Sequence, residues 1–130
     1  VNGVNVFTGK WALSPPRIKA EVFLDMARQY PFIDASRIGI TGWSGGGSQT
    51  LNCMFRYPKV FHTGIAIAFV ADQRLYDTIY QERYMNTPQN NPEGYHKGSP
   101  ITYARDWKVI CCLFMVREMI TCITKIARCW

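Results

Sequence analysis

A short apolar run, a glycine-rich turn and a helical segment follow one another between residues 37 and 57. This order constrains the fold more than any other feature of the chain. Residues 37–41 (RIGIT) are typical of a short buried strand, and residues 47–57 are typical of a helix. Between them the chain reads Gly42-Trp43-Ser44-Gly45-Gly46. Glycines allow the tight backbone that a strand needs to turn at once into a helix. The sequence therefore predicts a strand–turn–helix unit with Ser44 at the turn.

The pattern G-x-S-x-G in this setting is the nucleophile elbow of α/β-hydrolases. The turn would hold Ser44 in a strained backbone conformation and lift its Oγ clear of the sheet. We expect that side chains at Gly42 and Gly46 would clash with the strand or the helix. The N–H of Gly45, at the start of the helix, could donate to an oxyanion. The alternative is an ordinary glycine-rich turn without a catalytic role.

The rest of the chain alternates helices with strands. Apolar residues at helical spacing predict a helix over 17–30, and Pro31 ends it. The apolar run 63–70 predicts a central strand buried on both faces, parallel to the strand at 37–41. A helix is expected over 73–85 and a loop over 87–100. The predicted class is α/β, a fragment of an α/β-hydrolase fold with a mostly parallel sheet and flanking helices.

Composition argues against several kinds of partner. The formal net charge is +6, but the basic residues are scattered and form no run with interleaved aromatics, so we expect no nucleic-acid site. We find no apolar stretch long enough to span a bilayer and expect no membrane partner. The first residues lack a basic region followed by an apolar core, so this chain shows no signal peptide. The missing initiator Met fits a fragment.

The cysteines predict neither a metal site nor a cofactor. Cys53 lies alone in the helix after the turn and is expected to be a small core residue. The others crowd near the end of the chain at a spacing that matches no zinc or redox pattern: Cys111, Cys112, Cys122 and Cys129. We therefore expect no metal and no cofactor.

A serine nucleophile needs a histidine and an acid, which follow it in this order in α/β-hydrolases. The chain has two histidines, His62 and His96. His62 lies between the predicted helix and the next strand, and His96 lies in a polar segment. Neither occupies the place of a catalytic histidine, so both are expected to be loop or surface residues.

Residues 17–108 resemble the catalytic domain of the prolyl oligopeptidase family of serine peptidases, with the bacterial dipeptidyl peptidase IV-like group as the nearest branch. Three segments carry the resemblance: 33–47 around the serine, 55–58 (FRYP), and 76–85 (YDTIYQERYM) followed by 98–101 (GSPI). The third is the most specific, because Tyr-x-Glu-Arg-Tyr-Met is no general hydrolase feature. Residues 1–108 are therefore interpreted as a partial peptidase domain.

The resemblance implies roles for particular residues. Ser44 would be the nucleophile, and the Gly45 N–H would be one oxyanion donor. Tyr80, Tyr84 and Val70 would form the pocket that accepts a proline or alanine side chain. Without the resemblance, Tyr80 and Tyr84 would be interpreted as core aromatics. The implied activity is a serine-type peptidase that cleaves peptides after Pro or Ala, often dimeric when intact, in the periplasm or outside the cell.

The resemblance stops abruptly at Lys108, so residues 109–130 are treated as a divergent tail. Codons allowed for residues 108–130, with one base restored near Lys108, can encode KGNLLFVHGTGDDNVHYQNSEVL. This string resembles the missing segment of the family, including its acidic loop GTGDDNVH. Our hypothesis is a one-base deletion, which leaves the tail out of frame and the chain inactive without its acid and histidine. The alternative is a genuine strand, expected within 109–116, followed by an amphipathic helix.

Two other functions stay open on the sequence. The chain could be a non-catalytic interaction module of α/β-hydrolase fold, with a vestigial serine. It could also be an esterase of the same fold, although the segment that contains Tyr80 and Tyr84 argues against this.

Overall fold

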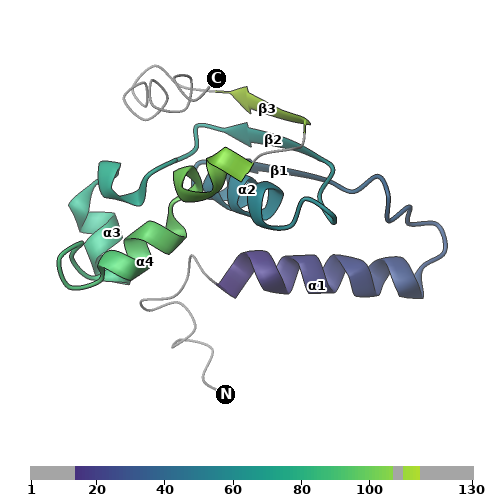
Figure 1. Cartoon of the computed structure of the whole chain (residues 1–130), viewed down its shortest axis with the longest axis horizontal. Helices are drawn as coiled ribbons and strands as arrows, with labels where there is room; N and C mark the ends of the chain where they lie inside the picture. Colours follow the sequence, from purple (N-terminus) through teal and green to yellow (C-terminus); the bar gives the residue numbers. More distant parts are fainter. Residues whose placement is uncertain (1–13, 107–109, 115–130) are drawn as a thin grey trace.

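The computed structural model describes residues 14–106 and 110–114, which form a parallel sheet with helices packed against it (Figure 1). The elements in chain order are α1 (Ser14–Gln29), β1 (Gly39–Trp43), α2 (Gly45–Arg56), β2 (Thr63–Ile67), the 3-10 helix η2 (Gln73–Leu75), α3 (Thr78–Met85), α4 (Pro92–Gly98), the 3-10 helix η3 (Pro100–Asp106) and β3 (Ile110–Phe114). The α/β class predicted from the sequence is confirmed.

The three strands lie in the order β1-β2-β3, and both pairs are parallel. In this register Trp43 lies beside Ile67, and Ile67 lies beside Phe114. The carboxyl ends of all three strands therefore meet at one edge of the sheet. The strand expected within 109–116 is present as β3.

Helix α2 is the centre of the core. Nine consecutive residues of this helix, from Gly47 to Phe55, are buried. It packs between the sheet and α1, whose Phe23 meets Phe61 edge to face at 5.8 Å between ring centroids. Cys53 is fully buried, and this burial raises the pKa of its thiol to about 11. Its predicted role as a small core residue is confirmed.

The prediction that the second strand is buried on both faces is wrong. Along β2 the burial alternates, with Ala66 fully buried and Ile65 38% exposed. Helix α2 covers the face that contains Gly64 and Ala66, where Met54 would lie only 3.0 Å from a Cβ at Gly64. No described helix packs on the other face. The strand also ends at Ile67, before residue 70, because Ala68 adopts a left-handed conformation with φ 48°.

The predicted helix over 73–85 is two elements. The 3-10 helix η2 ends at Leu75, and α3 begins at Thr78. Asp77 separates them with an extended backbone, and its side chain accepts a hydrogen bond of 2.8 Å from the Tyr80 N–H. An aspartate in this role favours the start of a new helix over the continuation of an old one.

The predicted loop over 87–100 contains helix α4. Asn91 caps this helix by accepting a hydrogen bond from the Gly94 N–H, and Pro92 occupies its first turn. Asn followed by Pro is a helix start signal. The sequence predicts a loop because Pro, Asn and Gly are frequent in this segment.

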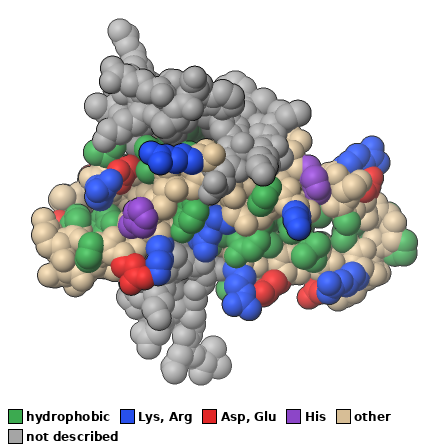
Figure 2. Space-filling model, viewed as in Figure 1, with side chains coloured by type: hydrophobic (Ala, Val, Ile, Leu, Met, Phe, Trp, Pro, Cys, Tyr) green, Lys and Arg blue, Asp and Glu red, His purple; other side chains and the backbone are tan. Residues whose placement is uncertain are grey.

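Lys and Arg side chains are interspersed with acidic and apolar ones on the face that Figure 2 shows. Ion pairs of the described surface include Arg17 with Glu21 and Arg37 with Asp34. No continuous basic patch covers the face in this view. Within the described ranges, no helix combines the length and the hydrophobicity needed to cross a membrane.

Candidate active site

Ser44 lies at the turn between β1 and α2, as predicted. Its backbone has φ 53° and ψ −118°, a region that non-glycine residues rarely adopt. Such a conformation costs about 1–3 kcal/mol and persists only where the surrounding structure enforces it. The Ser44 N–H donates a hydrogen bond of 2.8 Å to the carbonyl oxygen of Ile67. This bond holds the serine at the carboxyl edge of the sheet, beside the end of β2.

The glycines around Ser44 differ in what they contribute. A Cβ at Gly42 would lie 2.2 Å from the backbone oxygen of Gly46, and a Cβ at Gly47 would lie 2.8 Å from that of Ile67. A Cβ at Gly46 would meet nothing within 4 Å. The prediction of a clash at Gly46 is therefore wrong, because this position faces open space. The close approach of helix to strand occurs at Gly47.

Gly45 is the first residue of α2. The first N–H groups of a helix have no acceptor within the helix, and they lie at the positive end of its dipole. The Gly45 N–H is therefore suited to stabilise a negative oxygen that develops on a group bound at Ser44.

A pocket of about 120 Å³ opens beside Ser44. It brings together four of the predicted site residues: Ser44, Gly45, Val70 and Tyr80. The fifth, Tyr84, is not among the residues that line it. The Tyr84 ring instead packs against that of Tyr80, with centroids 5.0 Å apart and planes at 60°.

Sequence reasoning missed four residues that line the same pocket: Ser48, Gln73, Tyr76 and Gln81. Tyr76 packs edge to face on Tyr80, with ring centroids 5.7 Å apart. Ser48 lies one helical turn after Ser44, and Tyr76 lies four residues before Tyr80, so both spacings were available as signals. The two glutamines gave no such signal.

Ser48 fixes the wall that contains Val70. Its hydroxyl oxygen accepts a hydrogen bond of 2.8 Å from the Val70 N–H and lies 2.9 Å from the Val70 carbonyl oxygen, to which it donates. The Ser48 side chain is buried, so no water competes for these bonds. Helix α2 thus positions both the serine at its start and the pocket wall that follows β2.

Tyr80 carries a neutral hydroxyl at the edge of the pocket. Its pKa is raised, first by partial burial and then by the neighbouring Tyr84, Tyr76 and Asp77. Tyr80 is 44% exposed, so part of the residue is accessible from the solvent. Its hydroxyl stays protonated at neutral pH and can donate a hydrogen bond.

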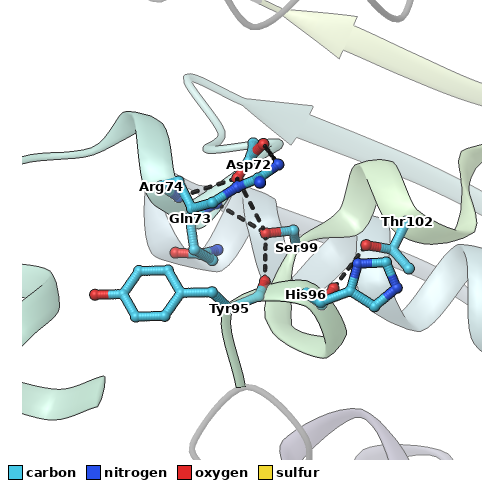
Figure 3. A network of polar contacts seen from close by, with 7 residues as sticks. All are labelled: Asp72, Gln73, Arg74, Tyr95, His96, Ser99 and Thr102. Atoms are coloured by element: carbon cyan, nitrogen blue, oxygen red, sulfur yellow. Dashed lines mark hydrogen bonds and ion pairs between the residues drawn. The ribbon is translucent and has the colours of Figure 1, made fainter. Parts of the chain in front are cut away.

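A polar network behind the pocket fixes the segment around Gln73 (Figure 3). The Ser99 hydroxyl accepts a hydrogen bond of 2.9 Å from the Gln73 N–H and donates one of 2.7 Å to the Tyr95 carbonyl. Asp72, only 5% exposed, receives the guanidinium of Arg74 at 2.6 Å. Burial by itself would raise the pKa of Asp72, but the hydrogen bonds and charge of Arg74, with a contribution from Ser99, lower it overall.

The two histidines lie away from Ser44. His62 directly precedes β2, and its N–H bonds to the Ile38 carbonyl at 2.9 Å, so it lies at the amino edge of the sheet. Ser44 follows the carboxyl end of β1, the opposite edge. His96 is exposed on α4 and borders a separate pocket with Arg74 and Tyr95. In the part of the chain that the structure describes, the pocket at Ser44 is lined by no histidine and no carboxylate.

The described residues contain no cluster of three or more His, Cys, Asp or Glu side chains that could hold a metal ion. The chemistry available at the pocket is therefore that of a serine hydroxyl, a helix N-terminus and neutral polar side chains.

Comparisons with known proteins point to one family. A protein of Uncinocarpus reesii named "Probable dipeptidyl-aminopeptidase B" is 53% identical to this chain over 66 residues. The aligned region covers 50% of this chain and 7% of the relative. A protein of the same name from Ajellomyces capsulatus is 43% identical over 93 residues, 71% of this chain and 10% of the relative.

The solved structure of Porphyromonas gingivalis dipeptidyl peptidase 4 superposes on 94% of this chain with a TM-score of 0.82 and 30% identity, and the match covers 18% of that protein. The chain therefore spans a small part of the length of each of these three relatives. The family model described as "Prolyl oligopeptidase family" matches residues 20–118. Together with the serine elbow and its pocket, these matches establish that the chain belongs to the prolyl oligopeptidase family.

Proposed function

We propose that Ser44 is the nucleophile of a dipeptidyl-peptidase-type serine peptidase, active in the complete protein to which this chain corresponds. The observation that carries the proposal is the strained Ser44 beside the Gly45 N–H at the start of α2, both of them lining one small pocket. In this reaction Ser44 Oγ loses its proton to a base and attacks the scissile carbonyl, whose oxygen takes up negative charge facing the Gly45 N–H. The C–N bond then breaks, the amine of the leaving peptide departs with a proton from that base, and an acyl-enzyme remains. Water then hydrolyses the acyl-enzyme and regenerates the serine.

The pocket is proposed to hold the side chain of P1, the residue that donates the scissile carbonyl. An apolar cavity of about 150 Å³ accepts benzene. The pocket at Ser44, at about 120 Å³, suits a five-membered ring or a smaller side chain. Val70 and Tyr80 provide apolar surface for a proline or alanine side chain, and Tyr84 supports the Tyr80 ring from behind.

We place the general base and the acid that orients it outside the residues described. Among those residues no histidine borders the pocket at Ser44. A serine hydroxyl without a base is a weak nucleophile at neutral pH. The chain by itself is therefore proposed to be inactive.

The one-base deletion near Lys108 remains part of this proposal, and the sheet topology supports it. Position 114 lies beside Ile67, so β3 ends at the same sheet edge as Ser44. In the restored frame one residue separates the end of this strand from the acidic loop GTGDDNVH. Carboxyl ends of parallel strands are where such folds gather their catalytic groups. The restored frame would thus bring a carboxylate to the correct edge of the sheet.

Two measurements test the proposal. Sequencing the gene through and beyond codon 108 should reveal the acidic loop, and further on a histidine, in one shifted frame. A protein expressed from the restored and extended frame should release chromophore from Xaa-Pro and Xaa-Ala substrates, whereas the chain as given should release none. Turnover by the given chain that disappears in Ser44→Ala would overturn the assignment of the base and point to His62 or His96.

A further inference from the structure

A second pocket, separate from the one at Ser44, lies between η2, the segment before α4 and α4 itself. Its volume is about 250 Å³. A cavity of about 150 Å³ accepts benzene, so this pocket is large enough for a small organic molecule. None of its lining residues borders the pocket at Ser44. The described residues that line it are Arg74, Pro88, Gln89, Pro92, Tyr95 and His96.

Solvent reaches five of these six residues, while the sixth, Tyr95, is only 1% exposed. The two prolines provide apolar surface. The polar groups that a ligand can touch belong to the exposed side chains of Arg74, Gln89 and His96. No carboxylate is among the described lining residues, so hydrogen-bond donors predominate in this pocket.

A buried aspartate fixes the guanidinium of Arg74 (Figure 3). The Arg74 Nε donates a hydrogen bond of 3.0 Å to Asp72 Oδ1, and Nη2 donates one of 2.6 Å to Oδ2. Asp72 is 5% exposed, whereas the Arg74 side chain is 62% exposed. The guanidinium is therefore oriented by the protein while most of its own surface stays accessible to a ligand.

Asp72 leaves part of the guanidinium unused. A guanidinium carries five N–H donors in one plane, and Asp72 accepts from one on Nε and one on Nη2. Within the described ranges no other acceptor bonds to the three that remain. Their Nη1–Nη2 edge presents two parallel donors, which suits both oxygens of one carboxylate. Because Asp72 already compensates the charge of Arg74, attraction for a second carboxylate depends on these donors more than on net charge.

The opposite side of the pocket is held by its own hydrogen bonds. The His96 carbonyl accepts a bond of 2.6 Å from the Thr102 hydroxyl, and its imidazole carries an N–H donor in either protonation state. The segment before α4, which contains Gln89, is fixed where the Asn91 side chain donates to the Met85 carbonyl at 2.8 Å. Groups positioned in this way lose little freedom when a ligand binds.

We propose that this pocket is a second ligand site, which binds a small organic carboxylate. The Nη1–Nη2 edge of Arg74 binds the carboxylate, and His96 donates a further hydrogen bond. Pro88 and Pro92 contact a short apolar group next to the carboxylate. This chemistry has two sources, a free carboxylic acid and the C-terminus of a peptide. The site goes beyond the proposed function, since it holds whether or not Ser44 is a nucleophile.

The test compares each acid with its amide, which has the same shape and no charge. Isotope-labelled chain is titrated by NMR with N-acetyl-leucine or its amide, and in a second pair with Gly-Gly-Leu or its amide. Millimolar ligand at low ionic strength limits screening by salt. The signals followed are the Nε–H groups of Arg74 and Arg28 and the backbone amide of His96. We expect the acid to bind roughly tenfold more tightly than its amide, as is typical of charge-assisted hydrogen bonds.

Two variants locate the effect. Arg74→Lys keeps a positive charge beside Asp72 but lacks the parallel donors, so the preference for the acid should fall to within about twofold. Arg28→Lys is the matched control: Arg28 also pairs with an aspartate, Asp25, at 3.0 Å, but it does not line the pocket. This variant should keep the wild-type preference. Should Arg74→Lys fail to fold, the wild-type ratios and the shifts at Arg74 and Arg28 decide the question alone.

The outcomes separate the sources from the failures. A preference for the acid in both pairs, or in the tripeptide pair alone, supports the site with a peptide C-terminus as its ligand. A preference with N-acetyl-leucine alone supports it with a free acid. Equal affinities of acid and amide in both pairs would overturn the site. So would a preference that survives Arg74→Lys, or shifts of equal size at Arg28 and Arg74, which indicate unspecific binding of anions.

Discussion

The elbow that carries Ser44 and the wall that carries Val70 and Gln73 border the same pocket, but different interactions hold them. The elbow depends on backbone packing: glycines at 42 and 47 let β1, α2 and β2 approach closely, and one backbone bond joins Ser44 to Ile67. The wall depends on buried side-chain hydrogen bonds from Ser48 and Ser99. A backbone-held element resists small changes in side-chain polarity, whereas a side-chain-held element does not.

The largest expected effect is on kcat, which should depend far more on the serine of the elbow than on a hydroxyl near the wall. In a protein expressed from the restored and extended frame, Ser44→Ala should reduce kcat by about a millionfold, as removal of a nucleophile does in serine proteases. Tyr84→Phe, which changes only a hydroxyl behind the wall, should leave kcat within a few-fold. The kcat of both variants is measured by hydrolysis of chromogenic Xaa-Pro substrates. A similar loss of kcat in Ser44→Ala and Tyr84→Phe would contradict the distinction between elbow and wall.

The next effect tests the backbone packing of the elbow. Gly42→Ala should destabilise the fold by about 3 kcal/mol, because its Cβ would meet the Gly46 backbone at 2.2 Å, which side-chain adjustment cannot relieve. Gly46→Ala is the matched control in the same turn. This position is open and helical, so alanine should be neutral or stabilise by about 0.5–1 kcal/mol. Denaturant unfolding of both variants gives the difference, and equal destabilisation would refute the packing argument.

A smaller effect tests the polar network behind the wall through pH. The folded-state pKa of Asp72 is lowered below its ordinary value of about 3.9. Its ionised form therefore adds stability that is fully present above about pH 4 and is lost as pH falls through the lowered pKa. Asp72→Asn should reduce stability by about 1–2 kcal/mol at pH 7 and make the decline in acid shallower. Chemical denaturation at a series of pH values measures this, and an unchanged acid profile would count against the network.

An effect of about the same size concerns the anchor of Val70. Ser48→Ala leaves the Val70 N–H and carbonyl without partners and should cost about 1–2 kcal/mol. Thr50→Val is the control, because the Thr50 hydroxyl bonds only to the Gly46 carbonyl within its own helix. It should cost less than about 1 kcal/mol. The backbone amide of Val70 should also exchange faster in Ser48→Ala alone, and equal exchange in both variants would show that Ser48 does not hold the wall.

Local sequence patterns were sufficient for the elbow. A strand, a turn with glycines and a helix each follow from residues adjacent in the chain, so the position of Ser44 between β1 and α2 was predictable. The two errors nearby are tertiary in origin. The clash expected at Gly46 occurs at Gly47, because the direction of close approach depends on where β2 lies. The prediction that β2 is buried on both faces is wrong because described helices cover only one face of this strand.

The wall was only partly predictable. Val70, Tyr80 and Tyr84 were named through a family resemblance, yet Gln73, Tyr76 and Gln81 line the pocket and Tyr84 does not. The single helix predicted over 73–85 is divided into η2 and α3, with Asp77 as the N-cap of α3. The contacts that decide the outcome, from Ser48 to Val70 and from Ser99 to Gln73, join residues 22 and 26 positions apart. No pattern of neighbouring residues reports such bonds.

The sequence by itself determined the α/β class, the elbow and its serine, because glycine content, apolar periodicity and turn chemistry act over a few consecutive residues. Only the tertiary structure decided which side chains face Ser44, that His62 lies at the far edge of the sheet, and that two buried amides join the pocket. The physical reason is that burial and hydrogen bonding between distant segments depend on how the strands and helices pack. That packing is a property of the whole fold and of no single segment.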